Sequence, residues 1–138
     1  MEWISKPKKM KDPRWLTQFE KKENYRFPEA YRQMVLACDE GVPKLSYFDT
    51  ETRRNCEVVV FLSFDPEADC SIWVEGDYGE EEERMKRYVS FSYEGCGDDI
   101  CFDKQNDSVV YVDHETLEVE QIASSFEEFL NMLHDYTE

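Results

Sequence analysis

Positive charge, histidine and long apolar runs are all scarce in this sequence. Its 138 residues contain 16 Lys and Arg against 32 Asp and Glu, which gives a formal net charge of −16. A duplex-binding domain is disfavoured, because affinity for phosphates comes largely from cationic side chains that release counterions. No apolar run is long enough to span a bilayer. With only two histidines, the chain has little imidazole for general-base catalysis.

Enzymatic signatures are also missing. The chain contains no GxGxxG or GxxxxGK[ST] phosphate loop, no HExxH zinc motif and no GxSxG nucleophile elbow. His114 and His134 are interpreted as structural, since the sequence places no serine or cysteine beside either. The five cysteines form no CxxC pair and are typical of reduced thiols. No apolar stretch follows the basic N-terminus, so we expect a cytoplasmic protein. Because the enzymatic signatures are missing, we expect no enzymatic activity and no cofactor.

Two clusters invite a metal-binding interpretation, and neither has suitable spacing. Cys96 lies between two glycines and is followed by Cys101. A reactive or metal-binding thiolate needs a nearby group that lowers the thiol pKa, and the sequence places no base beside this pair. The acidic stretch that follows contains Asp98, Asp99, Asp103 and Asp107. An EF-hand loop beginning at Asp103 would place Ser108 where the motif needs glycine. We therefore expect no metal site. A glycosidase-type carboxylate pair stays open, because its required separation is spatial.

The apolar content favours one compact domain over residues 1–138. Hydrophobic residues make up 41% of the chain and aromatic residues 14%, which argues against a disordered acidic protein. A chain of this length can bury enough surface to fold without disulfides or a structural metal. Residues 1–26 carry a net charge of +4, which leaves −20 of the total for the rest. We interpret the lysines of the basic segment 1–11 as solvated, rather than as an arm for nucleic acid or lipid.

Three helices are predicted from capping and periodicity. The first begins at Asp12 and Pro13 and ends near Asn24, and the second lies between Pro28 and Gly41. The third begins at Ser124 with Glu127 as a capping box, and is followed by apolar residues at helical spacing. Core residues are predicted on these helices and on one strand: Tyr31, Met34, Val35, Phe91, Phe126, Phe129 and Leu130.

Between the second and third helices, runs rich in Val, Ile, Tyr and Phe alternate with polar turns. Candidate strands are residues 45–48, 57–62, 71–75, 87–92, 99–103 and 109–112, with turns at 76–83, 95–97 and 104–108. Short connections favour antiparallel pairing. The sequence therefore predicts an α+β fold, in which an antiparallel sheet of five to six strands is packed by two N-terminal helices and one C-terminal helix.

The most unusual segment is an acidic run at residues 75–83, which contains four consecutive glutamates. Like charges repel, so an extended and solvated loop is the simplest interpretation. The alternative is an anionic surface that steers a basic protein partner toward this one. Charge alone selects the candidate partner-binding residues, which are Glu80, Glu81, Glu82, Glu83, Asp98 and Asp99.

The order of motifs resembles the SUKH superfamily, which includes fungal cell-wall assembly regulators and bacterial immunity proteins. In the first half the resemblance lies in Glu20, Phe27-Pro28, Tyr31 and Gly41. In the second half it lies in the segments Val89 to Phe91, Gly97-Asp98, Ile100 to Asp103, Val109 to His114 and Ser125 to Leu130. The resemblance covers roughly residues 15–133. Phe27 stands where the family usually has leucine, and a single glycine follows the second helix.

The resemblance implies a non-enzymatic protein-binding domain. Bacterial members bind and neutralise toxins, many of them nucleases or deaminases, so the expected partner is a cognate toxin with a basic nuclease-type domain. No nucleic acid or membrane partner is expected. The second hypothesis is a regulatory or scaffold domain that binds a cellular protein.

Overall fold

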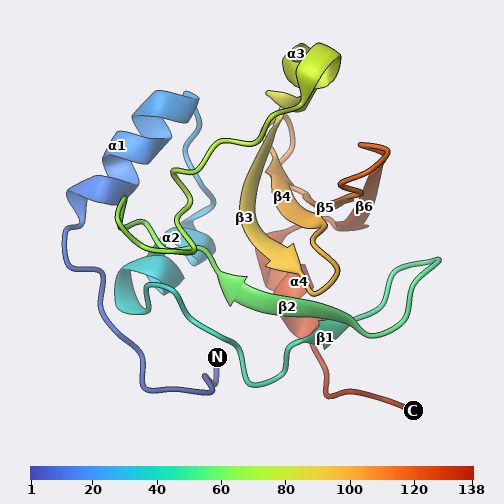
Figure 1. Cartoon of the computed structure of the whole chain (residues 1–138). Coiled ribbons are helices and arrows are strands. Elements are labelled where there is room, and N and C mark those ends of the chain that lie inside the picture. The colour runs from blue at the N-terminus through green and yellow to red at the C-terminus, as the bar shows by residue number, and fades with distance from the viewer.

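The computed structural model describes all 138 residues as helices around one curled sheet (Figure 1). The helices are α1 (Arg14–Glu23), α2 (Glu29–Ala37), the 3-10 turn η1 (Gly79–Glu81), α3 (Glu82–Met85) and α4 (Phe126–Met132). The strands are β1 (Tyr47–Phe48), β2 (Cys56–Phe61), β3 (Tyr88–Glu94), β4 (Asp99–Asp103), β5 (Val109–Val112) and β6 (Val119–Ala123). Each strand pairs antiparallel with the next along the chain. The predicted α+β fold class is confirmed.

Helix boundaries follow the predicted signals, with a one-residue shift at two N-termini. The N-cap of α1 is Pro13 and not Asp12, although the Asp12 carboxylate accepts the Arg14 backbone N–H at 3.0 Å. The C-cap of α1 is Asn24, in a left-handed conformation. The predicted capping box at the third helix is displaced by one residue. Ser125, and not Ser124, is the N-cap, and its side chain accepts the backbone N–H of Glu128 at 3.1 Å. The Glu128 carboxylate in turn accepts the Ser124 N–H.

The strand predictions are right for most of the sheet and wrong in two places. Residues 71–75 do not form a strand, because Ser71 makes only an isolated bridge with Ser63, Ile72 and Trp73 pack against the core through their side chains, and Val74 is exposed. Trp73 is held by its side chain and not by strand pairing, because its indole N–H donates to the Phe64 carbonyl at 2.9 Å. The sixth strand is instead β6, whose sequence VEQIA has a weak apolar pattern suited to an edge.

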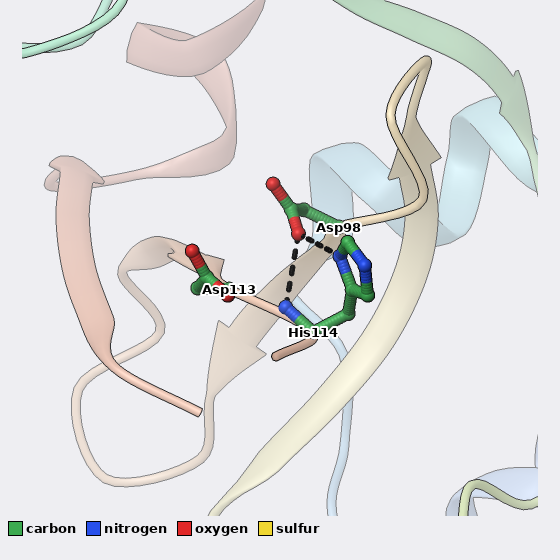
Figure 2. A group of neighbouring side chains, drawn as sticks. All are labelled: Asp98, Asp113 and His114. Atoms are coloured by element: carbon green, nitrogen blue, oxygen red, sulfur yellow. Dashed lines mark hydrogen bonds and ion pairs between the residues drawn. The ribbon is translucent and has the colours of Figure 1, made fainter. Parts of the chain in front are cut away.

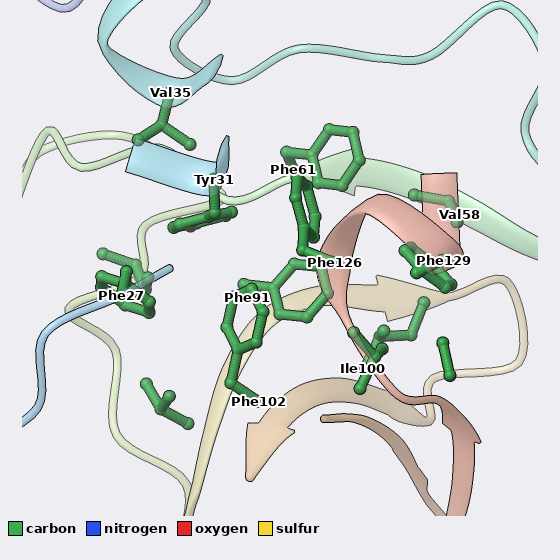
Figure 3. Close-up of a cluster of buried hydrophobic side chains, with 14 of the residues drawn as sticks. Phe27, Tyr31, Val35, Val58, Phe61, Phe91, Ile100, Phe102, Phe126 and Phe129 are labelled. Carbon is green, nitrogen blue, oxygen red and sulfur yellow. The ribbon is translucent and has the colours of Figure 1, made fainter. Parts of the chain in front are cut away.

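Aromatic rings fill the space between the sheet and helices α1, α2 and α4 (Figure 3). Tyr31 is fully buried, and its ring centroid lies 4.7 Å from that of Phe27 and 5.3 Å from that of Phe126. Phe91 and Phe102 lie 4.5 Å apart on neighbouring strands. Of the predicted core residues, Met34 and Leu130 are only partly buried, while the other five are buried: Tyr31, Val35, Phe91, Phe126 and Phe129.

A buried carboxylate joins the first two helices. Glu20 accepts the Phe27 backbone N–H at 2.8 Å and two N–H groups of Arg32 at 3.0 Å. Both charged side chains are nearly buried, at 10% and 11% exposure. Because the Arg32 fork and the backbone N–H satisfy the carboxylate, this arrangement holds the α1–α2 connection in place. It gives a physical role to the Glu20 and Phe27-Pro28 motif of the sequence.

The second face of the sheet carries its own smaller apolar cluster, composed of Met85, Cys101, Val110 and Val112. Met85 is 3% exposed and belongs to α3, which lies just before β3 (Figure 1). A single buried methionine therefore anchors the acidic helix on the face of the sheet that α1, α2 and α4 leave uncovered.

The basic segment 1–11 packs along the body of the protein. Its backbone exchanges hydrogen bonds with residues 36–44, among them Ile4 N–H to Val42 at 3.0 Å. The Trp3 ring lies so close to Gly41 that a Cβ there would sit 2.3 Å from it, so only glycine fits. The lysines of the segment remain exposed, as predicted.

Candidate functional site

The four consecutive glutamates lie on η1 and α3, and all four are exposed. The expectation of an extended loop is therefore wrong. Salt bridges at i,i+3 spacing explain the helical turn, because Arg84 pairs with Glu81 at 2.8 Å and Lys86 pairs with Glu83 at 3.0 Å. Glu80 and Glu82 have no cationic partner. The turn thus presents unneutralised negative charge to solvent.

Asp98 lies at the centre of a hydrogen-bond network between the β3–β4 turn and the end of β5. Its Oδ2 accepts the Tyr111 hydroxyl at 2.5 Å, and its Oδ1 accepts the His114 backbone N–H at 2.9 Å. The Nδ1 atom of His114 also contacts Oδ1 (Figure 2). Asp98 is only 5% exposed, so its carboxylate is committed to these groups. Asp98 therefore positions the half-exposed His114 ring.

These contacts shift the two pKa values in opposite directions. Burial by itself would raise the pKa of Asp98, but the hydrogen bonds from Tyr111 and His114 outweigh it and lower that pKa. The hydrogen bond to Asp98 raises the pKa of His114, which increases its protonated fraction near neutral pH. The pair consequently favours a carboxylate beside an imidazolium.

Asp98, Asp113 and His114 converge closely enough to be tested as a metal site (Figure 2). Their donor set does not fit one. Both oxygens of Asp98 already accept hydrogen bonds, as described above. Asp113 accepts the backbone N–H groups of Glu115 and Thr116 at 2.8 and 3.1 Å, and its other oxygen faces Arg53 at 3.4 Å. A cation would have to displace these donors and lie near a guanidinium.

Asp99 has a different environment from its neighbour. It is half-buried on the second face of the sheet, and the only hydrogen bond to its carboxylate comes from the Ser90 hydroxyl at 3.4 Å. Burial, together with the nearby Asp98 charge, raises the pKa of Asp99. Of the two adjacent carboxylates, only that of Asp99 therefore remains without strong donors.

A sequence model of the SMI1 / KNR4 family (SUKH-1) matches residues 12–132. The chain belongs to this family. The match extends from Asp12 through α4 and so includes both the Glu20 contacts and the Asp98 network. No curated protein matches the chain. The family resemblance seen in the sequence is thereby confirmed.

Neither Cys96 nor Cys101 of this SUKH-1 domain is an activated nucleophile. Cys96 is exposed on the β3–β4 turn, and the adjacent charge of Glu94 raises its thiol pKa. Cys101 is buried, and desolvation raises its pKa as well. Both thiols are therefore held in the protonated form. No helix of the structure is long and apolar enough to cross a membrane.

Sequence reasoning selected Asp98 and Asp99 together because both are acidic. It missed Tyr111, the buried partner of Asp98, and it missed the contrast between the two carboxylates. The Gly97-Asp98 and Val109 to His114 motifs hold the two sides of this network. Nothing in the sequence pairs Asp98 with Tyr111, because the two meet only across the β4–β5 hairpin.

Proposed function

We propose that this SUKH-1 domain is a non-enzymatic immunity protein that binds and neutralises a cognate bacterial toxin of the nuclease or deaminase type. The observation that carries the proposal is a net charge of −16 in a SUKH-1 domain whose acidic turn is only partly neutralised, since Glu80 and Glu82 have no cationic partner. A nuclease domain binds phosphates through a basic surface. An acidic protein is complementary to that surface.

The proposed mechanism is occupation of the toxin's substrate-binding surface, without chemical modification of the toxin. Glu80, Glu81, Glu82 and Glu83 form an exposed anionic turn that accelerates encounter with a basic surface. Asp98 contributes through the position it gives to His114, since its own carboxylate is buried. The expected site of action is the cytoplasm, and no cofactor or metal takes part.

Co-expression tests this function. Cells are made to express the toxin domain encoded beside this protein, with the wild-type chain or with an unrelated acidic protein of similar charge. The expected result is survival only with the wild-type chain, together with a complex that co-purifies. Equal killing in both cultures would overturn the immunity proposal. The unrelated acidic control separates specific neutralisation from a general effect of negative charge.

A regulatory or scaffold role is the second candidate, since the SUKH superfamily that the sequence resembles includes fungal cell-wall assembly regulators as well as immunity proteins. This role also consists of binding without catalysis, but its partner is a cellular protein. Failure of rescue in the co-expression assay, combined with a stable complex with a host protein, would favour this role.

A further inference from the structure

A groove with a volume of about 820 Å³ lies beside the acidic turn. Its walls come from α1, residues 69–78, α3 and the first half of β3. Its lining includes both apolar side chains, such as Ile72, Tyr78 and Met85, and carboxylates. We call it the β3-edge groove. It is open at one side and therefore resembles a docking channel more than an enclosed ligand cavity.

The groove exposes an unpaired strand edge. β2 pairs with β3 only at residues 92–94, and the last contact is the Leu62 N–H to the Phe91 carbonyl at 2.9 Å. Residues 88–90 pair with β4 on their other side. No backbone hydrogen bond joins residues 63–78 to residues 86–90, although both segments line the groove. An open edge of this kind can accept a further strand.

Three carboxylates of the groove have no cationic partner. Its lysines are already paired: Lys22 with Glu23 and Glu75, Lys86 with Glu83, and Lys104 with Glu23. By contrast, Asp69, Glu82 and Asp99 have no cationic partner within salt-bridge distance. Asp99 is the most buried of the three, so it gains the most from a bound cation.

We propose that the β3-edge groove binds an extended basic segment of the partner protein, which adds a strand to β3 at residues 88–90 and places an arginine or lysine against Asp99. The strand edge supplies backbone hydrogen bonds, and the carboxylate supplies selectivity for a cationic side chain. The inference rests on the proposed protein-binding function and names the site and the partner chemistry for it.

Peptide titration of the isotope-labelled full chain tests the proposal by NMR. The probe is a short peptide of alternating arginine and threonine. One comparison peptide has glutamate in place of arginine, and another has N-methylated backbone amides. We expect amide shifts centred on residues 88–90 and on Asp99 with the first peptide, and loss of binding with the other two. Asp99→Asn should weaken binding about tenfold, because it removes the anion that pairs with the arginine.

Asp135→Asn is the matched control, since it removes one exposed carboxylate outside the groove. It should change affinity less than about twofold. Three results would each overturn the groove assignment: no binding, shifts confined to η1 and α3, or equal binding by the N-methylated peptide. If wild-type co-expression still rescues cells in that case, only the groove is wrong. If the peptide binds as expected and rescue fails, the immunity function is wrong and the groove remains.

Discussion

Replacing Asp98 with asparagine tests whether the buried network stabilises the fold. The change keeps the shape of the side chain but removes its charge. Asparagine can still accept the His114 backbone N–H, yet its amide group then faces the Tyr111 hydroxyl in place of a carboxylate oxygen. A hydrogen bond to a charged group contributes about 1.5–3 kcal/mol. The His114 ring is 47% exposed, so solvent screens its ion pair with Asp98, and the hydrogen bonds dominate the expected effect.

We therefore expect Asp98→Asn to lower the free energy of unfolding by about 2–3 kcal/mol near pH 6, measured by urea denaturation. The pH dependence gives a second measurement. The pKa of Asp98 is lowered in the folded state, so its stabilisation is present above the ordinary value of 3.8 and is lost as pH falls through the folded pKa. The difference in the free energy of unfolding between the wild type and Asp98→Asn should therefore become smaller under acid conditions.

His114 acts in the opposite direction. Its pKa is raised in the folded state, so its contribution is complete below the ordinary value of 6.5 and is lost as pH rises through the folded pKa. Asp99→Asn is the matched control. Because the folded state raises the pKa of Asp99, removal of its charge should leave stability unchanged or increased. A cost below about 0.5 kcal/mol for Asp98→Asn, or equal costs at both positions, would refute this account of the network.

Four further predictions concern the core, the metal question and the acidic turn. Phe129 is fully buried, so Phe129→Ala should cost about 3–5 kcal/mol in urea denaturation, and a cost below about 1 kcal/mol would mean that α4 does not dock as described. The Tyr31 hydroxyl is buried with no hydrogen-bond partner, so Tyr31→Phe should keep stability or raise it by about 1 kcal/mol in the same assay. Prolonged chelation should leave the melting temperature unchanged, and a fall that calcium or zinc reverses would contradict the structural role given to the Asp98 cluster. Replacement of residues 80–83 by glutamine should slow toxin association and reduce its salt dependence in stopped-flow kinetics, with a stability change below about 1 kcal/mol, whereas unchanged kinetics would exclude a steering role.

Local signals were sufficient for the three main helices, α1, α2 and α4, and for the central strands. Proline at a helix start, asparagine at a helix end and apolar residues at helical spacing act within a few residues, so they can be read from the chain alone. Strands β4 and β5 have the predicted bounds because both are almost wholly buried and rich in apolar residues. The signal failed at residues 71–75, where Ile72 and Trp73 pack against the core but Val74 is exposed and the segment does not join the sheet.

The acidic segment shows a second limit of local reasoning. Repulsion among four glutamates favours an extended loop when the segment is considered alone. The structure instead places Arg84 and Lys86 one turn away and buries Met85 against the sheet. Burial of that methionine stabilises the turn, and it is available only because β4 and β5 leave an apolar cluster on that face.

By itself the sequence determined the fold class, the three main helices, the negative charge and the family resemblance, because these depend on composition and on short-range spacing. Only the tertiary structure decided which carboxylates are available. Asp98 and Asp99 are neighbours in the chain, yet one contacts Tyr111 on the core side of the sheet while the other shares the opposite face with Cys101. Side chains along a strand alternate between faces, so the partners of each carboxylate come from residues far away in sequence. That separation leaves one acid satisfied and the other open to a cationic partner.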